Sequence, residues 1–294
     1  MTARALLYAS SGSLRAPWRW AGFLVIAIAT FVVAGRLMAS MGGWLGIASP
    51  LVRGELVLLI AMLVAHVVML RLVDRAPWSF VGLGRLQAGV SRLAVGAAVG
   101  AAGILLPSGA LLLVHWLRAV PDPAAQSTWV GYAGASALLF LPQSLAEELL
   151  ARGYLFAAVR EAAGWRWALA ITSVCFGLMH AANPGADVQS LLIVTFAGVF
   201  LGGVLLLTDS LYAAWMAHFA WNWSMAAVLH ASVSGLPVAG PGYRVVDAGP
   251  DVVTGGPWGP EGGLAAVAGM LFCLWVLIAW HRRHVPRTVQ PEPS

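Results

Sequence analysis

Eight long runs of apolar residues dominate this sequence and leave few folds open to it. A helix needs about 20 mostly apolar residues to cross a bilayer. Of the 294 residues, 60% are hydrophobic and only 10% are charged, whereas soluble domains carry roughly a quarter charged residues. We therefore expect an all-α fold, a polytopic membrane helix bundle of about eight transmembrane helices, built as a single membrane domain over residues 1–294. The expected spans are Trp20–Met41, Leu51–Leu72, Leu93–Leu117, Ala133–Val159, Trp167–Ala181, Leu191–Leu207, Leu211–His230 and Leu264–Trp280.

The arginines indicate the topology. All 17 basic residues are Arg, and they gather before the first span and after the second, fourth and last spans. The positive-inside rule then predicts an even number of spans with both termini in the cytoplasm. The absence of Lys, together with abundant Ala, Gly and Pro, is typical of a GC-rich bacterial genome, so we expect a multi-pass protein of the bacterial inner (plasma) membrane. The charge of +5 does not predict nucleic-acid binding, because the arginines are scattered between apolar runs.

Two adjacent carboxylates lie inside the fourth predicted span. Ionisable groups are costly within a bilayer and indicate a functional site by default. Glu148 and Arg152 are spaced i,i+4 and lie on one helix face, the favourable order for an ion pair. Glu147 points about 100° away from Glu148, and we expect it to have no partner on its own helix. An unpaired carboxylate at that depth is suited to accept a proton as a general base.

Three further polar residues occupy other predicted spans. His180 ends the fifth span, and His218 and Asn222 share a face of the seventh at i,i+4 spacing. Counted from Gly164 in the connecting loop, Glu147 lies 17 residues back and His180 lies 16 residues forward. Two antiparallel helices would bring both side chains to one depth, about 25 Å from the turn. We therefore expect Glu147, His180 and His218 to lie within one hydrogen bond or one bridging water of each other.

Together these segments resemble the CPBP intramembrane protease family, which comprises the type II CAAX prenyl endopeptidases and the bacterial Abi proteins. The family pattern is EExxxR on one helix, FxxxH on the next, and HxxxN or HxxxB further on. The matching residues here are Glu147-Glu148 with Arg152, Phe176 with His180, and His218 with Asn222. The resemblance covers about residues 131–230, which would be the catalytic core.

The resemblance implies peptide-bond hydrolysis inside the membrane. Carried over, Glu147 and His180 would activate water, and His218 and Asn222 would stabilise the oxyanion. Glu148 and Arg152 would support the site, and Phe176 would pack against it. The metal requirement stays open: Glu147, His180 and His218 could ligate zinc with water in the fourth position, or Glu147 could act as a base without metal.

The substrate is expected to be a membrane-anchored protein or peptide. A bacterial source argues against prenylated substrates, and the bacterial branch suggests peptide maturation, bacteriocin self-immunity or degradation of anchored peptides. Two alternatives remain. One is a non-enzymatic membrane scaffold or immunity protein of the same fold. The other is a proton-coupled transporter, although such proteins typically show internal repeats with broken helices, and this sequence shows none. The Gly- and Pro-rich loop at residues 231–263 is assigned no structure.

Overall fold

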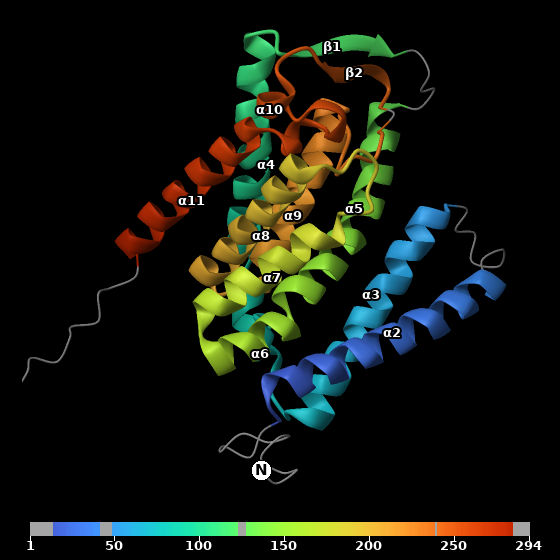
Figure 1. Cartoon of the computed structure of the whole chain (residues 1–294), viewed down its shortest axis with the longest axis vertical. Coiled ribbons are helices and arrows are strands. Elements are labelled where there is room, and N and C mark those ends of the chain that lie inside the picture. Colours follow the sequence, from blue (N-terminus) through green and yellow to red (C-terminus); the bar gives the residue numbers. More distant parts are fainter. Residues whose placement is uncertain (1–13, 42–48, 123–127, 239, 285–294) are drawn as a thin grey trace, which may run out of the picture.

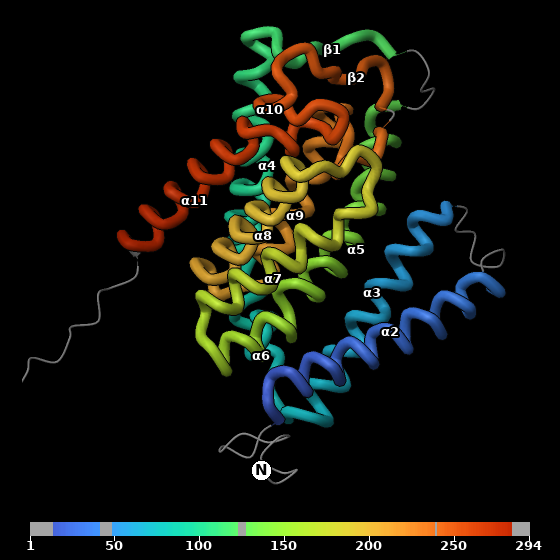
Figure 2. Tube along the Cα trace, in the orientation of Figure 1, coloured from blue at the N-terminus to red at the C-terminus, as the bar shows by residue number. Residues whose placement is uncertain are grey.

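The computed structural model describes residues 14–41, 49–122, 128–238 and 240–284, and this part of the chain is mainly helical (Figure 1). The longer helices are α2 (Ala16–Met41), α3 (Pro50–Val68), α4 (Val90–Leu113), α5 (Trp129–Arg152), α6 (Tyr154–Ala163), α7 (Trp165–Met179), α8 (Val188–Thr208), α9 (Leu211–Trp223) and α11 (Leu264–His284). Figure 2 shows α2 and α3 as a pair at one side of the remaining helices. The fold is thus a helix bundle, as expected.

Five of the described helices are long and apolar enough to cross a membrane by length and composition. They are Ala16–Met41, Pro50–Val73, Val90–Leu113, Val188–Thr208 and Leu264–Arg283. Helix α7 is apolar but has only 15 residues. The expected count of eight spans is therefore not confirmed, although several spanning helices identify a multi-pass membrane protein.

The predicted fourth span, Ala133–Val159, is wrong as a continuous helix. Helix α5 ends at Arg152, and α6 begins at Tyr154 after a break at Gly153. His66 on α3 stabilises this break. Its Nδ1 lies 2.7 Å from the backbone oxygen of Met62. Because that oxygen can only accept, Nδ1 carries the hydrogen, and Nε2 accepts from the Tyr154 N–H at 3.0 Å. A Cβ at Gly153 would lie 2.3 Å from that Nε2, so the close approach of α3 favours glycine there.

The predicted third span, Leu93–Leu117, also runs too far, because α4 ends at Leu113. Strand β1 (Leu117–Asp122) follows and pairs antiparallel with β2 (Gly242–Asp247). The Gly- and Pro-rich loop thus contains a strand, and it also holds the short helix α10 (Asp251–Thr254) and two 3-10 turns, Gly256–Trp258 and Pro260–Gly262. The predicted seventh span ends in a π-helical turn, Ser224–Leu229.

Helices α4 and α9 pack closely along a line of small residues. A Cβ at Gly96 would lie 2.1 Å from the carbonyl oxygen of Ala213, and one at Gly100 would lie 1.9 Å from that of Ala217. Small residues four apart allow membrane helices to approach this closely. Because Ala217 precedes His218, this contact helps to fix the depth and rotation of the histidine.

The topology prediction counted Arg19 among the loop charges before the first span, but the structure places it elsewhere. It lies inside α2 and is buried. Its guanidinium contacts the carboxylates of Asp74, at 2.6 Å, and Glu161, and its Nε donates to the Tyr154 hydroxyl at 3.0 Å. These contacts join α2 to α6. The side of the membrane on which the termini lie stays a prediction.

Candidate active site

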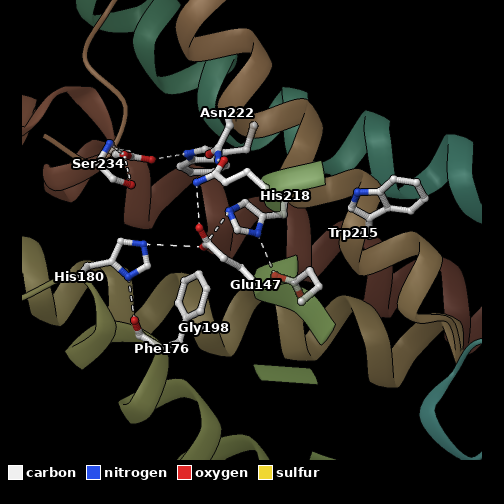
Figure 3. A network of polar contacts seen from close by, with 12 residues as sticks. Glu147, Phe176, His180, Gly198, Trp215, His218, Asn222 and Ser234 are labelled. Carbon is white, nitrogen blue, oxygen red and sulfur yellow. Dashed lines mark hydrogen bonds and ion pairs between the residues drawn. The ribbon is translucent and has the colours of Figure 1, made fainter. Parts of the chain in front are cut away.

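Glu147, His180, His218 and Asn222 come together from three helices (Figure 3). Glu147 lies on α5, His180 follows the last residue of α7, and His218 and Asn222 lie on α9. The Oε2 atom of Glu147 is 3.9 Å from Nε2 of His180 and 3.8 Å from Nε2 of His218. All four side chains named from the sequence therefore occupy one place. The expected hairpin of two continuous antiparallel helices is not what brings Glu147 and His180 together, because helix α5 ends before Gly153 and α6 begins after it.

The two imidazole rings are held by hydrogen bonds at Nδ1. The Nδ1 of His180 lies 2.8 Å from the backbone oxygen of Phe176, and the Nδ1 of His218 lies 2.9 Å from Oε1 of Glu148. Carbonyl and carboxylate oxygens accept but do not donate, so each Nδ1 carries a hydrogen. A neutral ring with Nδ1–H presents a lone pair at Nε2.

The Oε2 atom of Glu147 is buried and has no hydrogen-bond partner among the described residues. It faces the Nε2 atoms of His180 and His218 at distances too long for direct hydrogen bonds. An unpaired buried carboxylate oxygen carries a high desolvation cost. The geometry therefore suits a water molecule or a cation that lies between these atoms.

The ion pair predicted between Glu148 and Arg152 is present. Arg152 Nη1 lies 2.9 Å from Glu148 Oε1, and both side chains are fully buried. Arg152 also donates from Nη2 to the backbone oxygen of Gly198 at 3.0 Å. The sequence did not predict the contact between Glu148 and His218. This one carboxylate therefore joins α5 to α9 as well as to its own Arg.

Phe176 packs where the resemblance placed it. Its ring centre lies 4.9 Å from that of His180 and 5.8 Å from that of His218. The guanidinium carbon of Arg152 lies 4.2 Å from the ring centre, within cation–π range. The phenyl ring therefore contacts the Arg152 guanidinium and both imidazoles.

Glu147 has a partner on its own helix, contrary to expectation. Gln143, one turn earlier, donates from Nε2 to Glu147 Oε1 at 2.8 Å. The Nδ2 of Asn222 lies 3.2 Å from the Gln143 oxygen. The sequence signal for this contact was the i,i+4 spacing of two polar residues within an apolar helix.

Glu261 is a second residue that sequence reasoning missed, since it lies in the Gly- and Pro-rich loop at residues 231–263. It is buried beside the site. One oxygen accepts from the indole N–H of Trp221 at 2.8 Å, and the other accepts from the backbone N–H and the hydroxyl of Ser234. No sequence pattern links Glu261 to α9, because it lies 40 positions beyond Trp221 in a Gly- and Pro-rich segment.

A cavity of about 30 Å³ is lined by residues of α7, α8, α9, α11 and this loop. One water needs about 10–15 Å³, so the cavity has room for one or two. Its polar lining consists of His180, His218, Asn222, Ser234 and Glu261, and the rest is apolar. A water in this cavity would contact both site histidines and the Asn222 amide in an otherwise apolar setting.

The residues suggested as zinc ligands have suitable chemistry, since zinc binds imidazole nitrogens whose second nitrogen is hydrogen-bonded. Among the described residues, however, no group of three or more His, Cys, Asp or Glu is placed to hold a metal ion. Zinc ligation by Glu147, His180 and His218 therefore stays a prediction, and the steps proposed below use only side chains and water.

The comparison with known families falls on this part of the chain. Residues 128–224 match the family model for type II CAAX prenyl endopeptidases, Rce1-like. The match spans α5 to α9 and contains every motif residue named above, so the resemblance inferred from the motifs is confirmed over this third of the chain. It is a family of proteases. No curated protein and no solved structure matches the chain.

Proposed function

We propose that this protein is an intramembrane endopeptidase that hydrolyses peptide bonds of membrane-associated proteins or peptides. The observation that supports this most is the convergence of Glu147 Oε2 with the Nε2 atoms of His180 and His218, at 3.9 and 3.8 Å. Among the described residues this oxygen has no hydrogen-bond partner, and a water-sized cavity reaches both rings. A general base must lie within reach of the proton it removes, directly or through one water.

The two histidines have different partners at Nδ1, and this difference supports different roles. His180 donates to a neutral carbonyl, which suits a neutral ring whose Nε2 accepts from water. His218 donates to the Glu148 carboxylate, which favours the imidazolium, because a nearby negative charge stabilises the charged ring. Only the imidazolium can donate from Nε2 while Nδ1 also donates. His218 is thus suited to stabilise an oxyanion, together with the Asn222 amide.

The proposed reaction follows from these roles. A water held by Glu147 and His180 gives a proton to the Glu147 carboxylate, and its oxygen bonds to the carbonyl carbon of the substrate. The negative charge then develops on the carbonyl oxygen, where His218 and Asn222 donate hydrogen bonds. The C–N bond breaks, and the leaving nitrogen takes the proton from Glu147. The products are a carboxylic acid and an amine, and Glu147 is returned to its carboxylate form.

The bounds of the core, the location, the metal and the substrate class are proposed from the sequence alone. We propose residues 131–230 as the catalytic core of a single membrane domain, and a location in the bacterial inner membrane with both termini in the cytoplasm. In a zinc form of the enzyme, Glu147, His180 and His218 would hold the ion, which would polarise the water, and His218 would then serve as a ligand and not as an oxyanion donor. The substrate class proposed is a membrane-anchored peptide.

Cleavage of membrane-anchored peptides by the purified protein in detergent tests the proposal. The parent protein and His281→Ala, a histidine change on α11 outside the site, should cleave, and Glu147→Gln should not. The scaffold or immunity alternative would replace our proposal if the parent cleaves nothing and Glu147→Gln still supports the cellular phenotype. Proton flux into vesicles that requires Glu147, without cleavage, would instead support a transporter.

A further inference from the structure

Gln143 connects two proposed site residues that come from different helices. It lies on α5 one turn before Glu147, and its side chain reaches across to Asn222 on α9. The Gln143 Nε2 is 2.8 Å from Glu147 Oε1, and its oxygen is 3.2 Å from Asn222 Nδ2. No motif of the resembled family includes this position.

The chemistry of the groups fixes the direction of both hydrogen bonds. A carboxylate only accepts, so Gln143 must turn its NH₂ group toward Glu147. Its carbonyl oxygen then faces Asn222 and can only accept, so Asn222 must present its own NH₂ group to Gln143. With Gln143 absent, nothing in this chain of contacts would prevent the Asn222 amide from turning over by 180° and exchanging its oxygen and nitrogen.

Both consequences bear on the reaction. One N–H of Asn222 is used by Gln143, and the second remains on the same nitrogen and is free to donate to an oxyanion. At Glu147, the bond to Oε1 leaves Oε2 as the oxygen that faces His180 and His218. Gln143 thus determines which oxygen of Glu147 faces the two histidines and which end of the Asn222 amide faces the oxyanion.

We propose that Gln143 is a positioning residue that orients the Asn222 amide and the Glu147 carboxylate as a pair. The inference rests on the proposed function for its meaning in catalysis, but the orientation itself can be measured without activity. The chain contains only two asparagines, Asn183 and Asn222. Protein labelled with isotopic nitrogen in asparagine alone therefore gives two side-chain NH₂ signals by NMR, and the one lost in Asn222→Asp is that of Asn222.

The NMR experiment compares three variants. In Gln143→Met, which keeps the length of the side chain but neither hydrogen bond, the Asn222 signal should shift upfield while that of Asn183, which donates to the Ser234 backbone, stays in place. In Gln143→Glu, the new carboxyl and Glu147 would share one proton, because two carboxylates in contact do not both ionise. The other oxygen of the new carboxyl still accepts from Asn222, so the Asn222 signal should remain near the parent position. Ser144→Ala, at a buried hydroxyl without a hydrogen-bond partner among the described residues, should move neither signal. An unmoved Asn222 signal in Gln143→Met overturns the inference.

Kinetics separate positioning from a merely structural role. Gln143→Met should lower kcat by about tenfold to a hundredfold, the effect of misplacing groups in a site, with KM little changed. In an Asn222→Ala background the same change should cost much less, because Gln143 acts partly through Asn222. If the losses of kcat from Gln143→Met and Asn222→Ala multiply fully in the double variant, or if KM rises by the same factor as kcat falls, the inference is wrong. If the parent cleaves nothing, the proposed function fails, and the NMR result still decides the orientation.

Discussion

Oε1 of Glu148 lies 2.9 Å both from Nδ1 of His218 and from Nη1 of Arg152, so one buried oxygen holds a site histidine and a guanidinium together. The ion pair is therefore more than a tie within α5. The Glu148 carboxylate places a negative charge beside His218, the ring that we propose for oxyanion stabilisation, and it keeps a hydrogen on the Nδ1 of that ring.

This relationship predicts that Glu148→Gln loses both stability and activity. Arg152 would become an uncompensated buried charge, and breaking a buried pair costs about 3–5 kcal/mol. Chemical unfolding in detergent measures the free energy of unfolding. The matched variant Glu147→Gln, one residue earlier, should lose activity but only about 1 kcal/mol of stability, the value of one hydrogen bond. Equal losses of stability in the two variants would show that the roles of the two glutamates are misassigned.

The contact between α4 and α9 predicts a second effect. In Gly100→Ala the new Cβ would meet the Ala217 carbonyl oxygen at 1.9 Å, so α9 must move and carry His218 with it. Overpacking of this kind costs about 1–3 kcal/mol, and we expect cleavage to fall as well. Gly109→Ala, on the same helix, is the control, since a Cβ there meets nothing within 4 Å. Thermal unfolding and peptide cleavage of both variants provide the measurement, and a Gly100→Ala protein as stable and active as Gly109→Ala would contradict the prediction.

Sequence reasoning succeeded where a contact follows from spacing along one helix, and it failed where a contact depends on tertiary approach. The pairing of Glu148 with Arg152 follows from i,i+4 geometry. The bond from Gln143 to Glu147 has the same spacing and could have been predicted. The break at Gly153 could not, because the apolar run continues through it and the stabilising acceptor, His66, comes from another helix.

The loop at residues 231–263 illustrates the same limit. Its Gly and Pro residues indicate turns, but no periodicity indicates which turn packs where. Its position beside the site depends on Glu261, which reaches Trp221 from 40 positions away. A single buried acid in a polar loop gives no pattern from which that contact can be read.

Glu261 gives a third prediction. Glu261→Ala would leave the Trp221 indole N–H and the Ser234 N–H without their acceptors, and each buried unsatisfied group costs about 1–3 kcal/mol. We expect the loop to detach more readily, so limited proteolysis should cut within residues 231–263 sooner than in the parent. Glu261→Gln, which keeps one acceptor oxygen, should fall between the two. Identical cleavage rates for all three proteins would show that this carboxylate does not hold the loop.

The last prediction concerns Glu147 and His180 as a unit. If both act on one water, their losses should not add: Glu147→Ala and His180→Ala should each remove nearly all cleavage, and the double variant should be little worse. Independent contributions that multiply in the double variant would contradict the shared water.

A chelator such as phenanthroline, applied to the parent, then separates the two ways of activating that water. Activity lost and restored by zinc, with bound zinc measured by elemental analysis and lowered in His180→Ala, would assign Nε2 of His180 to a metal. Activity unchanged by the chelator, in protein without bound zinc, would leave Glu147 and His180 to activate the water themselves.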